Sequence, residues 1–168
     1  MPEPAPPLPA AAPEAQTTMR KATLKDVPTL YQLINGYAKK DLMLPRSMNE
    51  LYETIRDFTV MCDENNVVVA CAALHIDWDD LAELKSLAVN PAYQGKHLGT
   101  KLVENALVEA KELGIRQVFA LTYKLNFFKH IGFYEVDKNK LPHKVWGECI
   151  NCPKFTNCDE KALIRVVE

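Results

Sequence analysis

LAVNPAYQGKHLGTKLVENAL, residues 87–107, is the most informative stretch of the sequence. An apolar strand runs into Asn90, a short loop with Gly95 and Gly99 follows, and a long amphipathic helix comes next. The first four N–H groups of a helix lack partners within the helix, and the helix dipole attracts anions to that end. A loop of this kind can therefore bring its backbone close to a phosphate group. An ordinary strand-to-helix connection gives the same pattern, so this stretch alone leaves both interpretations open.

The composition is that of one globular domain. The chain has 168 residues, of which 48% are hydrophobic and 25% charged, enough to bury one core. Its formal net charge of −2 offers no electrostatic attraction to nucleic acid or to an anionic membrane. No apolar run approaches the roughly 20 residues that span a bilayer, and the N-terminus lacks a signal-peptide pattern. Five cysteines, an odd number, favour thiols in a reducing compartment. We therefore expect a cytoplasmic protein without nucleic-acid or membrane partners.

The first 18 residues differ in composition from the rest. They read MPEPAPPLPAAAPEAQTT, mostly proline and alanine, which favours an extended, disordered tail without a core. We expect the folded domain to occupy residues 19–168 and the tail to carry no chemistry.

Hydrophobic periodicity in the domain predicts alternating strands and helices. Asp26 is expected to cap the first helix, and Ser47 with Glu50 has the spacing of a capping box for the second. The predicted strands cover residues 19–24, 58–62, 66–76, 81–89, 116–122, 132–136 and 161–167, and the predicted helices cover residues 26–38, 47–57, 96–113 and 124–131. The order β-α-α-β-β-β-α-β-α-β-β defines an α/β chain without an internal repeat.

Several motifs in this order resemble the GNAT family of acyl-CoA-dependent N-acetyltransferases. The motifs are RKAT, RS before the second helix, VVACAALH, AELKSLAV, FALTYKLNFFKHIGF and LPHKVW. The similarity covers nearly all of the chain after the tail. Its closest branch is the acetyltransferase domain of N-acetylglutamate synthase, in its short stand-alone form. The resemblance implies a GNAT fold, with a mixed, mostly antiparallel sheet flanked by helices. It also implies acetyl-CoA as co-substrate and acetylation of the α-amine of L-glutamate, the first step of arginine biosynthesis.

The phosphate loop of the family usually reads Q/R-x-x-G-x-G/A. In this chain it is QGKHLG, so His97 occupies the position of the middle glycine. Histidine tolerates left-handed backbone better than most residues, and Gly95 can absorb strain beside it. The resemblance assigns cofactor binding to Leu87, Ala88, Val89, Gln94, Gly95, Lys96, His97, Leu98, Gly99, Thr100, Asn126 and Phe127.

Glu83 is the one acid within the strand at residues 81–89. It matches the family's general base, which removes a proton from the acceptor amine, usually through a water. A solvated glutamate paired with a lysine is the alternative. In the family this strand also splays from its parallel neighbour, which frees backbone groups for the pantetheine arm and for the thioester oxyanion.

The acid that protonates the leaving thiolate is left unassigned. The family often uses a tyrosine on the short helix, where this chain has Phe127 and Phe128. Tyr123 and Tyr134 are close in sequence, and we interpret both as packing residues.

Four cations lie in segments that approach the acceptor cleft of GNAT proteins. They are Arg20, Arg46, Lys85 and Lys124, and Arg20 matches the family's substrate-binding arginine. A guanidinium suits a carboxylate, although each of these side chains is equally consistent with an ordinary surface charge. Some N-acetylglutamate synthases carry an Arg and a Ser before the last strand, where this chain has NCDEK. The acceptor therefore stays open among glutamate, glutamine, another amino acid and a protein N-terminus, as does a non-catalytic regulator that binds CoA or an amino acid.

The segment WGECINCPKFTNC holds three cysteines close together. Cys149 and Cys152 have C-x-x-C spacing, and Cys158 with His143 would complete a structural zinc site. Free thiols or a redox-sensitive loop are the alternatives. We interpret Cys62 and Cys71 as core residues.

The sequence leaves the oligomeric state open, and a homodimer is one possible assembly.

Overall fold

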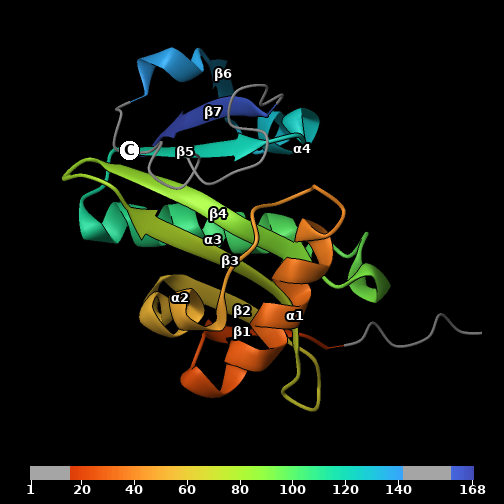
Figure 1. The fold of residues 1–168 in the computed structure, drawn as a ribbon. Coiled ribbons are helices and arrows are strands. Elements are labelled where there is room, and N and C mark those ends of the chain that lie inside the picture. Colours follow the sequence, from red (N-terminus) through yellow and green to blue (C-terminus); the bar gives the residue numbers. More distant parts are fainter. Residues whose placement is uncertain (1–15, 142–159) are drawn as a thin grey trace, which may run out of the picture.

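The computed structural model describes residues 16–141 and 160–168, and its elements follow the predicted order (Figure 1). The strands are β1 (Thr18–Lys21), β2 (Phe58–Cys62), β3 (Val68–Ile76), β4 (Leu81–Val89), β5 (Gln117–Thr122), β6 (Tyr134–Val136) and β7 (Lys161–Val166). The helices are α1 (Val27–Ala38), α2 (Met48–Glu53), α3 (Leu98–Leu113) and α4 (Leu125–His130), with short 3₁₀ turns η1 (Leu24–Asp26), η2 (Ile55–Asp57), η3 (Pro91–Tyr93) and η4 (Lys138–Lys140).

The strands form one mixed sheet in the order β1-β2-β3-β4-β5-β7-β6. Neighbouring strands are antiparallel except β4 and β5, which are parallel and are connected through α3. A parallel pair requires such a crossover, and a helix commonly supplies it.

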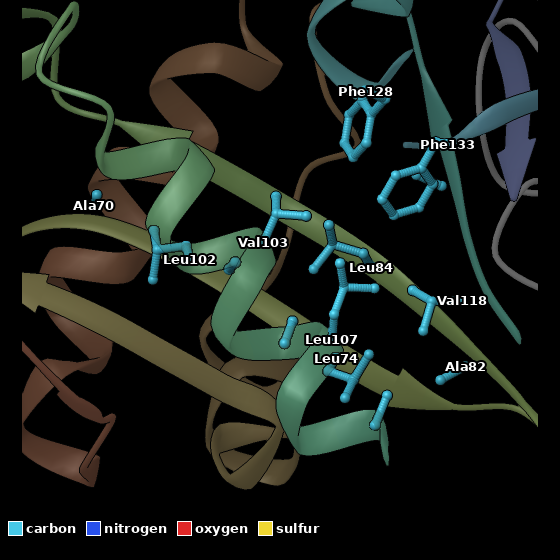
Figure 2. Packing of buried hydrophobic residues seen from close by; sticks show 14 of the residues in the cluster. Ala70, Leu74, Ala82, Leu84, Leu102, Val103, Leu107, Val118, Phe128 and Phe133 are labelled. Carbon is cyan, nitrogen blue, oxygen red and sulfur yellow. The ribbon is translucent and has the colours of Figure 1, made fainter. Parts of the chain in front are cut away.

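Helices cover both faces of the sheet (Figure 1). On one face, α1 and α2 bury Val27, Leu30, Ile34 and Leu51 against β2 and β3. On the other face, α3 packs Leu102, Val103 and Leu107 against Leu74 and Leu84, as Figure 2 shows. The alternation of apolar residues along β3 and β4 supplies both cores, because successive side chains point to opposite faces.

Local capping follows the prediction at one helix and differs at two. Ser47 and Glu50 form the expected capping box of α2. Asp26 occupies the expected N-cap position of α1, but its side chain makes no capping hydrogen bond to that helix. Its carboxylate instead accepts hydrogen bonds from Arg20 and from the backbone N–H of Thr23. Helix α3 begins at Leu98, two residues later than expected, because His97 is left-handed at φ +61°.

Strand β4 contains a bulge opposite β3, and its pairing with β5 ends partway along its length. Ala73 faces Lys85 and Cys71 faces Ala88, so two steps along β3 correspond to three along β4. The extra residue lies at Ser86, which is buried and left-handed at φ +54°, and the thiol of Cys71 contacts its carbonyl at 3.3 Å. The pairing of β4 with β5 is confined to residues 81–83. The two strands therefore stop pairing at Glu83, which is the splay that the resemblance implied.

Two further predictions concern membranes and core cysteines. Within residues 16–141 and 160–168, no helix has both the length and the apolar composition to cross a bilayer. Cys62 and Cys71 are buried free thiols, as expected for core residues. Burial raises the pKa of the Cys71 thiol to about 12, so this side chain stays protonated and unreactive at neutral pH.

Candidate active site

A cavity of about 510 Å³ lies beyond the point where β4 and β5 stop pairing. Residues 83–89 of β4 line one side, and residues 121–124 at the end of β5 line another. The loop before α3 and two phenylalanines of α4 close one end. The connection between α1 and α2 contributes residues 42–44 and 46, and Glu160 lies just before β7. A concave space of this size is typical of a site for a small molecule.

The loop before α3 is held in a left-handed conformation at two positions. Gly95 has φ +79° and His97 has φ +61°, and the helix begins directly after His97. Glycine has no side chain, so the left-handed conformation carries no steric penalty at Gly95. At position 97 the residue is histidine, which tolerates this conformation better than most residues do. A Cβ at Gly99 would lie 3.4 Å from Cζ of Phe127, an ordinary van der Waals distance, so Gly99 lies where the start of α3 meets α4.

Most of the predicted cofactor residues meet in this cavity. Two do not line it: Asn126 is exposed on α4, and the ammonium of Lys96 lies 5.0 Å from the centre of the Tyr93 ring. Those that line it are Leu87, Ala88, Val89, Gln94, Gly95, His97, Leu98, Gly99, Thr100 and Phe127. The arrangement brings the end of the splayed strand and the start of a long helix to one surface.

Glu83 lines the cavity at the last residue of β4 that pairs with β5. It is 9% exposed, which is unusual for a glutamate and inconsistent with a fully solvated side chain. His75 of β3 lies directly opposite it in the antiparallel register. Nδ1 of His75 is 2.7 Å from a carboxylate oxygen of Asp57, and this contact raises the pKa of His75 above its usual value. A titratable pair therefore neighbours the candidate base on the same face of the sheet.

Three of the four predicted acceptor cations line the same cavity: Arg46, Lys85 and Lys124. The backbone of Arg46 is fixed by Asn35 of α1, whose side chain accepts from its N–H at 3.1 Å and donates to its carbonyl at 2.9 Å. Lys124 precedes α4, and its N–H donates to the hydroxyl of Thr122 at 2.9 Å. The cavity therefore combines the carboxylate of Glu83 with three cationic side chains.

Arg20 is the exception, because it is not among the residues that line this cavity. It lies on β1 at the edge of the sheet, away from the residues that line the cavity. Its guanidinium donates two hydrogen bonds to the carboxylate of Asp26, at 2.7 and 2.9 Å, and one to Asn66 at 3.1 Å. The hydrogen bond from Arg20 lowers the pKa of the buried Asp26. Arg20 therefore stabilises the corner between β1 and α1.

Replacing Arg20 with glutamine is expected to lower the free energy of unfolding by about 1–2 kcal/mol at neutral pH, because Asp26 loses a charged partner. The lowered pKa means that this stabilisation is present above the pKa of the unfolded aspartate and is lost as pH falls through the folded value. Urea unfolding at neutral and acid pH measures the difference, with the exposed Lys25→Gln as control. Unchanged stability combined with a large rise in the acceptor KM would return Arg20 to the acceptor site.

Several residues that line the cavity were not assigned to the site from the sequence, among them Tyr37, Tyr123 and Glu160. Tyr37 near the end of α1 and Glu160 before β7 were not assigned, and Tyr123 was interpreted as a packing residue although it lines the cavity. Tyr134 is half exposed on β6, outside the cavity. Sequence carried no signal for Tyr37, because its role depends on how α1 lies across β4.

The predicted zinc ligands Cys149, Cys152 and Cys158, and His143 with them, lie outside the described residues. In the part of the chain that the structure describes, no group of three or more histidine, cysteine, aspartate or glutamate residues could hold a metal ion.

Residues 25–135 match the model of the acetyltransferase (GNAT) family. An uncharacterized N-acetyltransferase of Chlorobaculum tepidum is 39% identical over 155 residues, which make up 92% of this chain and 99% of the relative. A protein of Mycobacterium tuberculosis named amino-acid acetyltransferase is 35% identical over 137 residues, which make up 80% of this chain and 78% of the relative.

Comparison with solved structures also finds acetyltransferases among the matches. N-acetylglutamate synthase from Neisseria gonorrhoeae, complexed with coenzyme A and N-acetyl-glutamate, has a TM-score of 0.81 at 26% identity and matches 94% of this chain. The match covers only 36% of the Neisseria chain. Rv2747 from Mycobacterium tuberculosis, solved in complex with CoA, has a TM-score of 0.77 at 30% identity, over 90% of this chain and 99% of that one. The predicted GNAT fold is therefore confirmed, and this chain belongs to the GNAT family of acetyltransferases.

Proposed function

We propose that this acetyltransferase moves the acetyl group of acetyl-CoA to the α-amine of an anionic amino acid, with L-glutamate as the preferred acceptor. One observation carries the proposal: a single cavity combines the buried carboxylate of Glu83 with Arg46, Lys85 and Lys124, beside the loop that begins α3. The names of the relatives support an amino-acid acceptor, and the coenzyme A in the solved neighbours supports the donor.

In the proposed reaction, Glu83 accepts a proton from the acceptor ammonium, directly or through one water. The neutral amine then attacks the thioester carbonyl, forming the C–N bond. Among the described residues, no strand pairs with β4 beyond Glu83 on the β5 side, so backbone N–H groups there are suited to stabilise the oxyanion. Collapse of the tetrahedral intermediate breaks the C–S bond and releases the CoA thiolate, which leaves readily because its pKa is modest. The proton that the amide nitrogen loses passes to this thiolate, so the products are the N-acetylated acceptor and CoA.

Arg46, Lys85 and Lys124 would hold the acceptor carboxylates. Glu160 lines the same cavity and adds a negative charge before β7, where some relatives of the N-acetylglutamate synthase branch carry cationic and hydroxyl side chains. This difference keeps glutamine as the second candidate acceptor, because its side chain is neutral.

An acceptor panel tests the proposal directly. The full chain is incubated with acetyl-CoA and L-glutamate, L-glutamine, L-aspartate, L-lysine, a short peptide or spermidine, and thiol release and acetylated products are measured. We expect glutamate to give the largest kcat/KM. Efficient acetylation of the peptide or spermidine, with glutamate and glutamine ignored, would overturn the acceptor class. Binding of CoA without thiol release for any amine would favour a non-catalytic regulator.

A further inference from the structure

We propose that Tyr37 is a positioning residue for the loop at residues 94–97, acting through Gln94 on the affinity for the nucleotide end of the donor. The Nε2 atom of Gln94 donates to the hydroxyl of Tyr37 at 2.8 Å. The same hydroxyl donates its single proton to the backbone carbonyl of Val89. One side chain from α1 therefore joins the end of β4 to the first residue of the loop.

The two residues that the hydroxyl group joins to Gln94, Tyr37 itself and Val89, are both held by the surrounding fold. Tyr37 lies in the last turn of α1, and its half-buried ring packs against the core that α1 and α2 form with β2 and β3. Val89 is the last residue of β4, and its neighbour Asn90 donates its N–H to Val69 of β3 at 2.7 Å. Both ends of the hydroxyl contact are therefore attached to regular secondary structure, while Gln94 belongs to the irregular segment between η3 and α3.

The loop needs such an anchor because of its backbone conformation. Gly95 and His97 are both left-handed, and a non-glycine residue such as His97 keeps this strained conformation only where its surroundings hold it. Fixing the preceding Gln94 limits the conformations that the segment can adopt before a ligand arrives. A preorganised loop binds more tightly, because less ordering remains to be done on binding.

We call the two hydrogen bonds of the Tyr37 hydroxyl, with Gln94 and with Val89, the clamp. Its position defines which part of the donor it affects. The hydroxyl of Tyr37 meets Val89 and Gln94 at the end of β4 and the start of the loop, whereas Glu83 lies six residues before Val89 on β4. The clamp is therefore expected to change the binding of the pyrophosphate-bearing part of CoA and to leave the transfer step alone. This inference rests on the proposed use of acetyl-CoA.

Replacing Tyr37 with phenylalanine keeps the ring and removes both hydrogen bonds. We expect the Kd for CoA, measured by calorimetry, to rise about 3–15-fold, the range for one or two neutral hydrogen bonds. The kcat at saturating acetyl-CoA should stay within about twofold, since the clamp does not touch the reacting atoms. The matched control is Tyr31→Phe, because Tyr31 lies on the same helix and is 40% exposed.

Two further measurements separate positioning from a general structural role. The kcat/KM for acetyl-CoA should fall in Tyr37→Phe, whereas that for acetyl-pantetheine, which lacks the pyrophosphate and the nucleotide, should not. In a double-mutant cycle with Gln94→Ala, the double variant should bind CoA about as weakly as the weaker single variant, because either change opens the same clamp.

Several results would overturn the inference. They are an unchanged Kd in Tyr37→Phe, an equal loss of kcat/KM for both donors, and additive effects in the double-mutant cycle. Failure of the unaltered chain to bind CoA would instead overturn the proposed use of acetyl-CoA, and this inference with it. The Gln94→Ala arm keeps the test decisive if the melting temperature of Tyr37→Phe falls, because Gln94 lies on an exposed loop.

Discussion

Replacing Glu83 with glutamine is expected to lower kcat by about 10²–10⁴-fold, the usual contribution of a positioned general base. The amide has nearly the same size as the carboxylate but cannot accept the proton that an ammonium must lose before it attacks. Glu83 lines the cavity but lies earlier on β4 than residues 87–89, which lead into the cofactor loop, so the Kd for CoA should change little. Steady-state kinetics with glutamate and calorimetry with CoA measure the two quantities separately.

The control for Glu83→Gln is Glu64→Gln, which makes the same chemical change in the exposed turn between β2 and β3. The pH dependence of kcat provides a second criterion. The acidic limb of the wild-type profile should report the base, and it should disappear or move in Glu83→Gln. Near-normal turnover with an unchanged profile would remove Glu83 from the mechanism, and the neighbouring pair of His75 and Asp57 would become the next candidate.

Sequence was sufficient for the features that depend on local pattern. The capping box at Ser47 requires only two side chains three residues apart. Alternation along β4 places Glu83 on the face opposite Leu84, which belongs to the core beneath α3. The glycines between β4 and α3 also predicted the loop at residues 94–97. The helix begins two residues later than predicted, because His97 is left-handed.

Features that depend on long-range geometry could not be predicted in this way. Arg20 was expected at the acceptor because the pattern of its strand matched the family, but the chain turns back after β1 and brings Asp26 within reach. The sequence around Ser86 contains no glycine that would indicate a bulge, so the bulge is visible only from the register of β4 with β3. Tyr37 reaches Gln94 across 57 positions of sequence, so only the packing of α1 reveals the contact.

The largest expected effect on cofactor affinity comes from Gly95→Val. Gly95 has φ +79°, and nothing lies within 4 Å of the place where a Cβ would stand, so the penalty arises from the backbone and not from crowding. A β-branched residue strongly disfavours this conformation, and the loop is expected to leave it. We expect the Kd for CoA to rise about 10–100-fold, which corresponds to the 1–3 kcal/mol cost of left-handed backbone. Calorimetry measures the affinity, and thermal unfolding checks that the fold is retained.

Two variants distinguish backbone strain from side-chain size at Gly95. Gly95→Asn adds a side chain of similar volume to valine, but asparagine adopts left-handed backbone far more readily, so its CoA affinity should stay within about threefold of the wild type. Gly36→Val places valine at an exposed position of α1 where a Cβ also meets nothing within 4 Å and φ is not positive, so CoA binding should be unaffected. If Gly95→Asn and Gly95→Val lose affinity equally, contact between the new side chain and the ligand is the cause. If neither loses affinity, the loop at residues 94–97 does not hold the cofactor, and the site must lie elsewhere in the cavity.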